Sequence, residues 1–260
     1  MERYNHLNTY FKQLFGERTL KICIDGNFTC PNRDGICGYG GCIFCSSKGS
    51  GELIKAAPDI SSQVTQYFES HRAKRANKFI AYFQNFTNTY DTTENLKKKY
   101  DSALIDGRIV GLDIATRPDC IDEKIAKLIS SYMPKYKVFV ELGLQTSNDY
   151  TGKLINRGYD SIKFTEAVKI LNKYNIPVIC HIMVGLPTEA KLISISEELN
   201  GKIYSFNVFS NVVNTIKFIN EHNISGIKIH STYIVKNTKL NDMYENGEYT
   251  PITYDEYMQI

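Results

Sequence analysis

Four cysteines are concentrated within one glycine-rich stretch of the sequence. Eleven residues separate Cys30 from Cys42, two separate Cys42 from Cys45, and Cys37 lies between the first two. Four thiolates at this spacing could close a tetrahedral structural zinc site. Three thiolates could instead hold an iron–sulfur cube and leave one iron without a protein ligand, able to bind a cofactor or substrate directly. The spacing alone leaves both kinds of metal site open.

The remaining three cysteines stand apart from this stretch. Cys23 and Cys180 fall within apolar strand patterns, so we expect both to be small core residues. Cys120 stands at the start of a predicted helix, where the helix dipole is expected to lower the pKa of its thiol.

Helix and strand patterns alternate along the rest of the chain. Residues 1–16 are expected to form an amphipathic helix, and residues 26–51 a long loop. The predicted strands are short and mostly apolar, at residues 19–25, 78–84, 109–115, 138–144, 178–184 and 226–230. Because helical patterns separate these strands, and parallel neighbours need a long connection, they predict a parallel sheet. We expect an α/β fold with a partial (β/α)6 TIM-like barrel, although a doubly wound open sheet would show the same alternation.

Polar side chains follow the ends of these predicted strands. They are Gln84, Asn85, Thr87, Thr116, Arg117, Asp119, Gln145, Thr146, Glu189 and His230, and Pro187 lies in the same group as Glu189. The carboxyl ends of parallel strands form the ligand-binding rim in both architectures, so these residues should converge on one site. This pattern is typical of an enzyme.

The composition sets the broad class of the protein. A length of 260 residues with 42% hydrophobic residues fits a single α/β domain spanning residues 1–260. The formal net charge of +3 is too small to indicate a nucleic-acid or membrane partner. No secretory leader and no run of eighteen apolar residues is present, so a cytoplasmic protein is expected. In that reducing compartment its seven cysteines are better explained as ligands, catalysts or core residues than as disulfides.

Several segments resemble the radical SAM superfamily. The final cysteine pair has the form C-x-aromatic-C, with Phe44 between Cys42 and Cys45. The segments CPNRDG, YFQNFTNTY, GLDIATRPDC, ELGLQT, INRGYD, HIMVGLP and GIKIH resemble family segments in the same order, from about Tyr4 to about Lys239. The most similar group is the Elongator-catalytic-subunit-like branch, with its YhcC-like bacterial proteins.

This resemblance implies a cofactor set and a reaction class. Cys30, Cys42 and Cys45 would ligate three irons of a [4Fe-4S] cluster, and S-adenosylmethionine would chelate the fourth. Reduction by a donor such as a flavodoxin or ferredoxin would cleave the bound cofactor to a 5′-deoxyadenosyl radical, which abstracts hydrogen from an unknown substrate. The family does not ordinarily have a cysteine at Cys37, so we expect an inert thiol there.

The resemblance also implies residues that bind S-adenosylmethionine. Phe44 would pack near the adenine, and Gln84 would approach the methionine amino group, where relatives have a Gly-Gly-Glu segment. Arg157 would bind the carboxylate, and Glu141 or Gln145 the amine and ribose hydroxyls. Without the resemblance, Glu141 and Arg157 would be explained as a structural ion pair near the sheet edge.

Lys228 and His230 stand at the end of the last predicted strand, within GIKIH. We expect a catalytic, substrate-side role for them as an acid, a base or an anion contact. The family tends to carry another histidine where this chain has Tyr233. His181 lies inside an apolar strand and is expected to be a core residue with its hydrogen bonds satisfied.

The sequence leaves a rival function and two substrate classes open, and it differs from the family in the length of two segments. A zinc-stabilised α/β binding module would use all four clustered cysteines as structural ligands. The substrate of a radical enzyme could be a small molecule or RNA, and the sequence does not specify the oligomeric state. Compared with the family, residues 190–206 are expected to be an insertion that forms an extra helix. The chain ends at Ile260, which predicts a short carboxyl-terminal tail.

Overall fold

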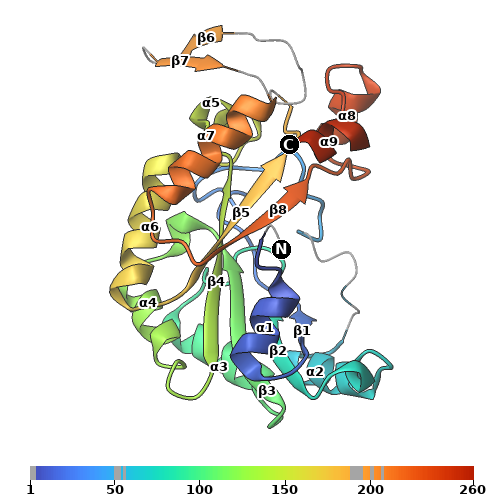
Figure 1. The fold of residues 1–260 in the computed structure, drawn as a ribbon, viewed down its shortest axis with the longest axis vertical. Coiled ribbons are helices and arrows are strands. Elements are labelled where there is room, and N and C mark those ends of the chain that lie inside the picture. Colours follow the sequence, from blue (N-terminus) through green and yellow to red (C-terminus); the bar gives the residue numbers. More distant parts are fainter. Residues whose placement is uncertain (1–3, 50–53, 55–56, 188–195, 200–201, 206–207) are drawn as a thin grey trace.

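The structure is a computed structural model that describes residues 4–49, 54, 57–187, 196–199, 202–205 and 208–260. Its main sheet has six parallel strands (Figure 1). They are β1 (Thr19–Ile24), β2 (Lys78–Phe83), β3 (Ile109–Thr116), β4 (Lys137–Gln145), β5 (Val178–Val184) and β8 (Gly226–Ser231). Their order in the sheet is β1-β2-β3-β4-β5-β8. Because this order follows the sequence without the reversal of a doubly wound sheet, the partial barrel is confirmed.

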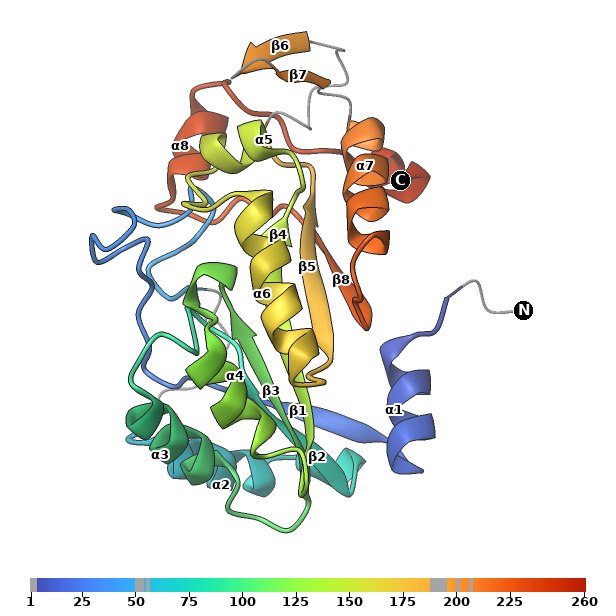
Figure 2. The same ribbon diagram turned by 90° about the vertical axis from the view of Figure 1, so that its left-hand side faces the viewer.

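Helices cover the outer face of this half-barrel. They are α2 (Ile60–Glu69), α3 (Thr93–Ala103), α4 (Glu123–Ser130), α6 (Ser161–Lys173) and α7 (Val208–Asn220). Figure 2 shows α3, α4 and α6 along one side of the sheet. Phe164 of α6 and Leu96 of α3 are fully buried in the core cluster that these helices form with the outward-facing strand residues. Asp59, Thr92 and Asp160 cap α2, α3 and α6 by accepting hydrogen bonds from backbone N–H groups.

A short amino-terminal helix, α1 (Leu7–Phe15), closes the bottom of the half-barrel. Its Phe11 packs against Ile80 and Phe139, which point into the barrel near the amino ends of β2 and β4. Figure 2 shows α1 on the opposite side of the sheet from α4 and α6. This packing leaves the carboxyl ends of the strands as the place for a site.

The cysteine loop is fastened to the carboxyl-terminal part of the chain. Ile43 joins Ile155, Leu240 and Tyr249 in a small apolar cluster. The Ile43 N–H donates to Ile155 O at 3.0 Å, and the Leu240 N–H donates to Ile43 O at 2.9 Å. The short helices α5 (Asp149–Leu154), α8 (Lys239–Glu245) and α9 (Tyr254–Gln259) complete this region.

The insertion differs from the expected helix. Within residues 190–206, β6 (Ser196–Leu199) and β7 (Lys202–Ser205) pair as an antiparallel ladder, and the other residues lie outside the described part. The sequence contained the signal, because Asn-Gly at residues 200–201 is typical of a two-residue hairpin turn. In the described part of the chain, no helix is both long and apolar enough to cross a membrane.

Candidate active site

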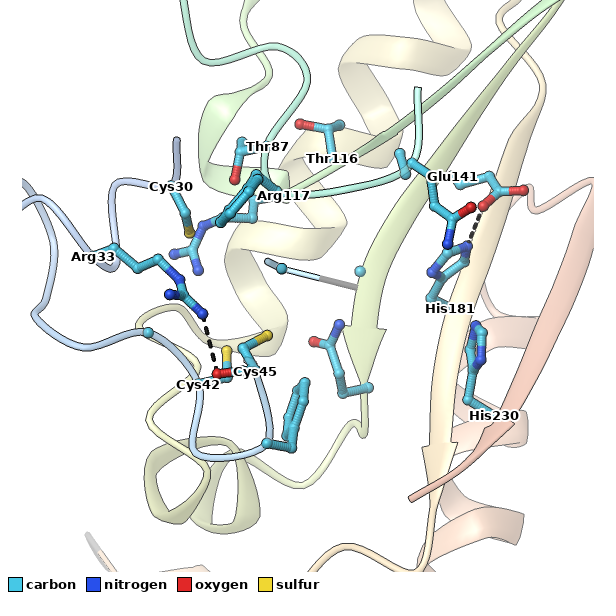
Figure 3. A pocket seen from close by; sticks show the side chains of 18 of the residues that line it. Cys30, Arg33, Cys42, Cys45, Thr87, Thr116, Arg117, Glu141, His181 and His230 are labelled. Carbon is cyan, nitrogen blue, oxygen red and sulfur yellow. Dashed lines mark hydrogen bonds and ion pairs between the residues drawn. The ribbon is translucent and has the colours of Figure 1, made fainter. Parts of the chain in front are cut away.

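One cavity at the carboxyl ends of the strands brings together most of the predicted site residues. Its lining includes Cys30, Cys42, Phe44, Cys45, Gln84, Glu141, Gln145, Lys228 and His230. Figure 3 shows the three cysteines on one side of the cavity and Glu141, His181 and His230 on the other. The cavity therefore joins the cysteine loop to the barrel interior.

The three cysteines of this lining are free thiols on the same wall. A hydrogen bond between Cys42 and Cys45 raises the pKa of Cys42 and lowers that of Cys45. Within the described residues, no three His, Cys, Asp or Glu side chains are grouped so that they could hold a single metal ion. In a cluster, by contrast, each cysteine binds a different iron.

Cys37 is directed elsewhere. Its Sγ lies 3.7 Å from Asp119 Oδ2 and 3.4 Å from Arg117 Nη2. Arg117 also forms a salt bridge with Asp119 at 2.6 Å. Cys37 is absent from the residues that line the cavity. Cys37 thus lies outside the lining that the other three thiols share.

Two asparagines that the sequence analysis did not single out hold the loop in place. Asn156 Nδ2 donates to Gly41 O at 2.8 Å and to Tyr39 O at 3.2 Å. Asn32 Nδ2 donates to Asn156 O at 2.5 Å and lies 3.8 Å from Cys42 Sγ. Both asparagines fall within quoted family segments, CPNRDG and INRGYD, which was the available signal.

Arg157 is placed as a structural residue, away from the cavity. Its guanidinium is fully buried and donates to Leu144 O at 2.6 Å, Thr146 O at 2.7 Å and Tyr159 O at 2.9 Å. It also forms a salt bridge with Asp149 at 2.9 Å. Each of its nitrogens therefore has a protein acceptor, and this placement does not support binding of a cofactor carboxylate. Its ionic partner is Asp149, so the structural pair with Glu141 is not formed either.

Gln145 reaches the cavity through an unusual backbone conformation at the end of β4. Its φ is 61°, in the left-handed region, and the β4–β5 register shifts between Gly143 and Gln145. The Tyr159 hydroxyl lies 2.9 Å from Gln145 Oε1 and 3.0 Å from Gly143 O. A side chain at Gly143 would collide with Gln145, since a Cβ there would lie 2.7 Å from Gln145 Nε2. Strain at a cavity wall is typical of a functional site.

Glu141 lies deeper than a cofactor-binding rim residue, in a polar layer that crosses the barrel interior. Its Oε1 accepts from Lys21 at 2.5 Å. Its Oε2 accepts from Tyr82 at 2.5 Å, from His181 at 2.6 Å and from Lys228 at 3.0 Å. The Glu141 side chain is 1% exposed. Although burial opposes ionisation, these donors and nearby cations hold the pKa of Glu141 well below its usual range.

Asp113 of β3 completes this layer. Lys21 pairs with one of its oxygens at 2.5 Å, and Oδ1 is buried without a hydrogen-bond partner among the described residues. Burial, with repulsion from Glu141, raises the pKa of Asp113 to about 7. Lys21 and Asp113 were not predicted as site residues. Charges inside otherwise apolar strands were the signal for them.

The two histidines of the site lie next to each other. The rings of His181 and His230 have centroids 5.3 Å apart, and both line the cavity. Burial and the neighbouring His181 and Lys228 lower the pKa of His230 to about 4. His181 has the hydrogen-bond partner that was expected of it, Glu141, but it lines the cavity rather than lying in the apolar core.

Two expectations for the other cysteines are corrected. Cys23 is exposed, because it lies on the face of β1 that it shares with Lys21, toward the barrel interior. The pKa of Cys120 is raised by burial rather than lowered. Cys180 is buried, as predicted.

The cavity wall also contains an unused polar group. Thr87 Oγ1 is buried without a hydrogen-bond partner in the described part of the chain, and Thr87 lines the cavity near Cys30 (Figure 3). Buried hydroxyls normally have partners, so a bound polar group would satisfy this one. Three thiols, an aromatic ring at Phe44 and this hydroxyl fit an iron–sulfur cluster with a nucleoside cofactor beside it.

Comparisons with known proteins identify the family. The sequence profile of the Radical SAM superfamily matches residues 33–193, and that of the Radical_SAM C-terminal domain matches residues 224–260. The chain is 35% identical to the uncharacterized protein YtqA of Bacillus subtilis (strain 168), over 100% of this chain and 76% of that protein. It is 31% identical to protein YhcC of Escherichia coli (strain K12), over 94% of this chain and 72% of that protein. The chain belongs to the radical SAM superfamily and is an enzyme.

Solved structures support the same fold. Elp3 from the archaeon Methanocaldococcus infernus matches with a TM-score of 0.59 and 18% identity, over 90% of this chain and 50% of that chain. Coproporphyrinogen III oxidase (HemN) from Escherichia coli, a radical SAM enzyme, matches with a TM-score of 0.54 and 12% identity, over 91% of this chain and 49% of that chain. The chain thus spans about half the length of these proteins.

Proposed function

We propose that this enzyme holds a [4Fe-4S] cluster with Cys30, Cys42 and Cys45 and binds S-adenosylmethionine beside it. When reduced by one electron, this cofactor pair supplies a 5′-deoxyadenosyl radical that removes hydrogen from a substrate. The observation that carries the proposal is the placement of these three thiols on one wall of a cavity that reaches the barrel interior. A flavodoxin or ferredoxin fits as electron donor.

The protein's own residues bind and orient in this proposal. Phe44 offers an apolar face for the adenine, while the amides of Gln84 and Gln145 offer donors and acceptors to the amino and hydroxyl groups. Lys228 and His230 face the substrate from the opposite wall. Glu141 acts as a positioning residue, because its contacts orient His181 and Lys228.

A zinc-stabilised binding module is the rival function. It would need Cys37 as a fourth ligand beside the other three thiols. The contacts of Cys37 with Arg117 and Asp119, and its absence from the cavity lining, support the three-ligand cluster instead.

Two substrate classes are candidates for this enzyme. RNA is supported by the tRNA uridine(34) acetyltransferase of Dehalococcoides mccartyi (strain CBDB1), which is 32% identical over 55% of this chain and 28% of that protein. A small molecule is supported by the low net charge of +3. Transfer of deuterium from labelled pools of either class into 5′-deoxyadenosine identifies the substrate.

Anaerobic reconstitution with iron and sulfide tests the proposal itself. We expect a coloured protein with about four irons per chain that, once reduced, converts S-adenosylmethionine to 5′-deoxyadenosine. A colourless protein that retains one zinc and does not cleave the cofactor would support the binding module and overturn the proposal.

A further inference from the structure

The side chains that line the cavity carry more positive than negative charge. Among the residues that line the cavity, Arg33, Arg117 and Lys228 are cationic, and Glu141 is the carboxylate. Arg33 and Arg117 lie at the cysteine end, where Arg33 donates to Cys45 O at 3.1 Å. Lys228 lies at the other end, on β8, so it is the cation of the barrel interior that a substrate would meet.

Glu141 does not neutralise Lys228 by itself. Its two oxygens serve four donors, of which two are lysines: Lys21 at 2.5 Å and Lys228 at 3.0 Å. Lys21 is the deeper lysine and has the closer contact, and it also pairs with Asp113. Because the pKa of Asp113 is raised to about 7, that second carboxylate is partly protonated at neutral pH. The two lysines of this layer therefore face one full and one partial negative charge, and Lys228 is the lysine of the pair that lines the cavity.

Lys228 has unused bonding capacity toward the cavity. An ammonium carries three N–H donors, and Lys228 uses two in its contacts with Tyr82 Oη at 2.9 Å and Glu141 Oε2 at 3.0 Å. Its side chain is 34% exposed, whereas that of Glu141 is 1% exposed. The third donor is available to a ligand in the cavity.

The neighbouring imidazoles extend this donor set. His181 Nε2 is bonded to the ionised Glu141, which makes Nε2 the protonated nitrogen and fixes the tautomer. His230 lies beside it with a ring separation of 5.3 Å, and its ring nitrogens have no hydrogen-bond partner among the described residues. A partly buried ring without partners, next to a lysine, is suited to a polar ligand.

We propose that Lys228 and His230 bind an anionic oxygen-acid group of the substrate, a carboxylate or a phosphate, at the inner wall of the cavity. This inference rests on the proposed function in one respect, which is that the bound anion belongs to the enzyme's substrate. The anion accepts a charge-assisted hydrogen bond from the Lys228 ammonium and a second from a His230 N–H. The remainder of the substrate then extends toward the three cysteines.

The same contacts argue against a cationic or an apolar group at this wall. A substrate ammonium would be repelled by Lys228, and Glu141, which could attract it, already accepts from four donors. An apolar group would leave the Lys228 and His230 donors desolvated and unpaired, which is costly. An anion satisfies both groups.

Anion titrations of the full chain, followed by NMR of the histidine rings, test this inference. The chain has five histidines, so the His230 and His181 ring signals can be assigned with single substitutions. Acetate and inorganic phosphate are the probes, applied to the protein as purified and after reconstitution. We expect at least one probe to shift the His230 signals saturably, and the probe that binds more tightly identifies the group as carboxylate or phosphate.

A charge-removing variant gives the decisive comparison. Lys228→Met should weaken binding of the probe about tenfold or more, since it removes a charge-assisted hydrogen bond. Lys236→Met removes an exposed lysine in the segment that follows β8 and should leave binding unchanged. If Lys228→Met fails to fold, Lys228→Arg, which keeps the charge, should still bind the probe, whereas Lys228→Gln should not.

Two outcomes overturn the inference. One is the absence of saturable shifts at His230 and His181 with either probe, and the other is equal binding by the wild type and Lys228→Met. Neither outcome depends on the cluster, because the titration uses no S-adenosylmethionine and no reductant. A protein that binds the anion but forms no cluster would refute the proposed function and leave the anion site standing.

Discussion

Lys21 of β1 and Glu141 of β4 meet at 2.5 Å across the interior of the half-barrel. In a flat sheet the two strands would be separated by about 14 Å, three strand spacings, because β2 and β3 lie between them. The salt bridge is therefore possible only because the sheet curves. It links the curvature of the fold to the charge arrangement of the site.

The pH dependence of stability tests the charge state of Asp113, which shares Lys21 with Glu141. Its pKa of about 7 in the folded protein exceeds the value of about 3.9 in an unfolded chain. Between these pH values the folded state binds more protons at this site, so the free energy of unfolding falls as pH rises. Asp113→Asn removes this contribution. The stability of the wild type relative to Asp113→Asn should fall by up to about 1.4 kcal/mol per pH unit from pH 4 to 7.

Urea denaturation at several pH values measures this difference. Asp106→Asn is the control, because Arg108 holds the pKa of Asp106 at about 2 and the carboxylate is ionised throughout that range. A difference between wild type and Asp113→Asn that stays constant with pH would show that Asp113 is not shifted.

Substitution of the cysteines distinguishes the three that are proposed to bind the cluster from Cys37, which is not. Cys30→Ala, Cys42→Ala and Cys45→Ala should each abolish cluster assembly and cofactor cleavage, because each removes a thiolate from the shared wall. Cys37→Ala should keep both, since its thiol contacts Arg117 and Asp119 instead. Iron content and 5′-deoxyadenosine formation are the measurements. Equal loss in all four variants would make Cys37 a ligand.

Replacement of Arg157 should reduce stability strongly. Arg157→Met removes a donor from three backbone carbonyls and breaks the ion pair with Asp149, which keeps only its hydrogen bonds from Ser161. The change should cost about 3–5 kcal/mol in free energy of unfolding. Lys153→Met, an exposed change on α5, should stay within about 0.5 kcal/mol. A variant at Arg157 that is as stable as the wild type but binds S-adenosylmethionine poorly would show that Arg157 binds the cofactor.

Replacement of Asn156 tests the clamp on the cysteine loop. Asn156→Gly keeps access to the left-handed backbone at φ 53° but removes the hydrogen bonds to Tyr39 O and Gly41 O. Iron should be lost to a chelator about tenfold faster, as expected when two hydrogen bonds are removed. Asn175→Gly is a matched control, since Asn175 also has a positive φ of 57° but follows α6. Similar iron loss in both variants would show that the clamp has no effect.

The sequence predicted the six strands to within about two residues, because short β-branched runs between turn signals are a local property. It also predicted part of the cavity lining, since this follows from where each strand ends. Of the predicted rim residues, the lining includes Gln84, Thr87, Thr116, Arg117, Gln145 and His230 but not Asn85, Asp119, Thr146 or Pro187, and Glu189 lies outside the described residues. The partners of Glu141 and Arg157 were not predictable, because they depend on curvature and on loop paths. Family likeness assigned both residues to the cofactor, whereas the structure places Arg157 among backbone carbonyls.

The helix that closes the barrel is made before the strands against which it packs. Phe11 and Leu14 of α1 pack with Ile80, Phe139 and Ile179, which belong to β2, β4 and β5. Since synthesis proceeds from the amino terminus, α1 leaves the ribosome long before β5 exists. The apolar face of α1 stays unpacked until most of the sheet has formed. Its contacts join residues that are distant in the sequence, which raises the contact order and slows folding. Docking of α1 can therefore serve as an observable marker that the first five strands have assembled.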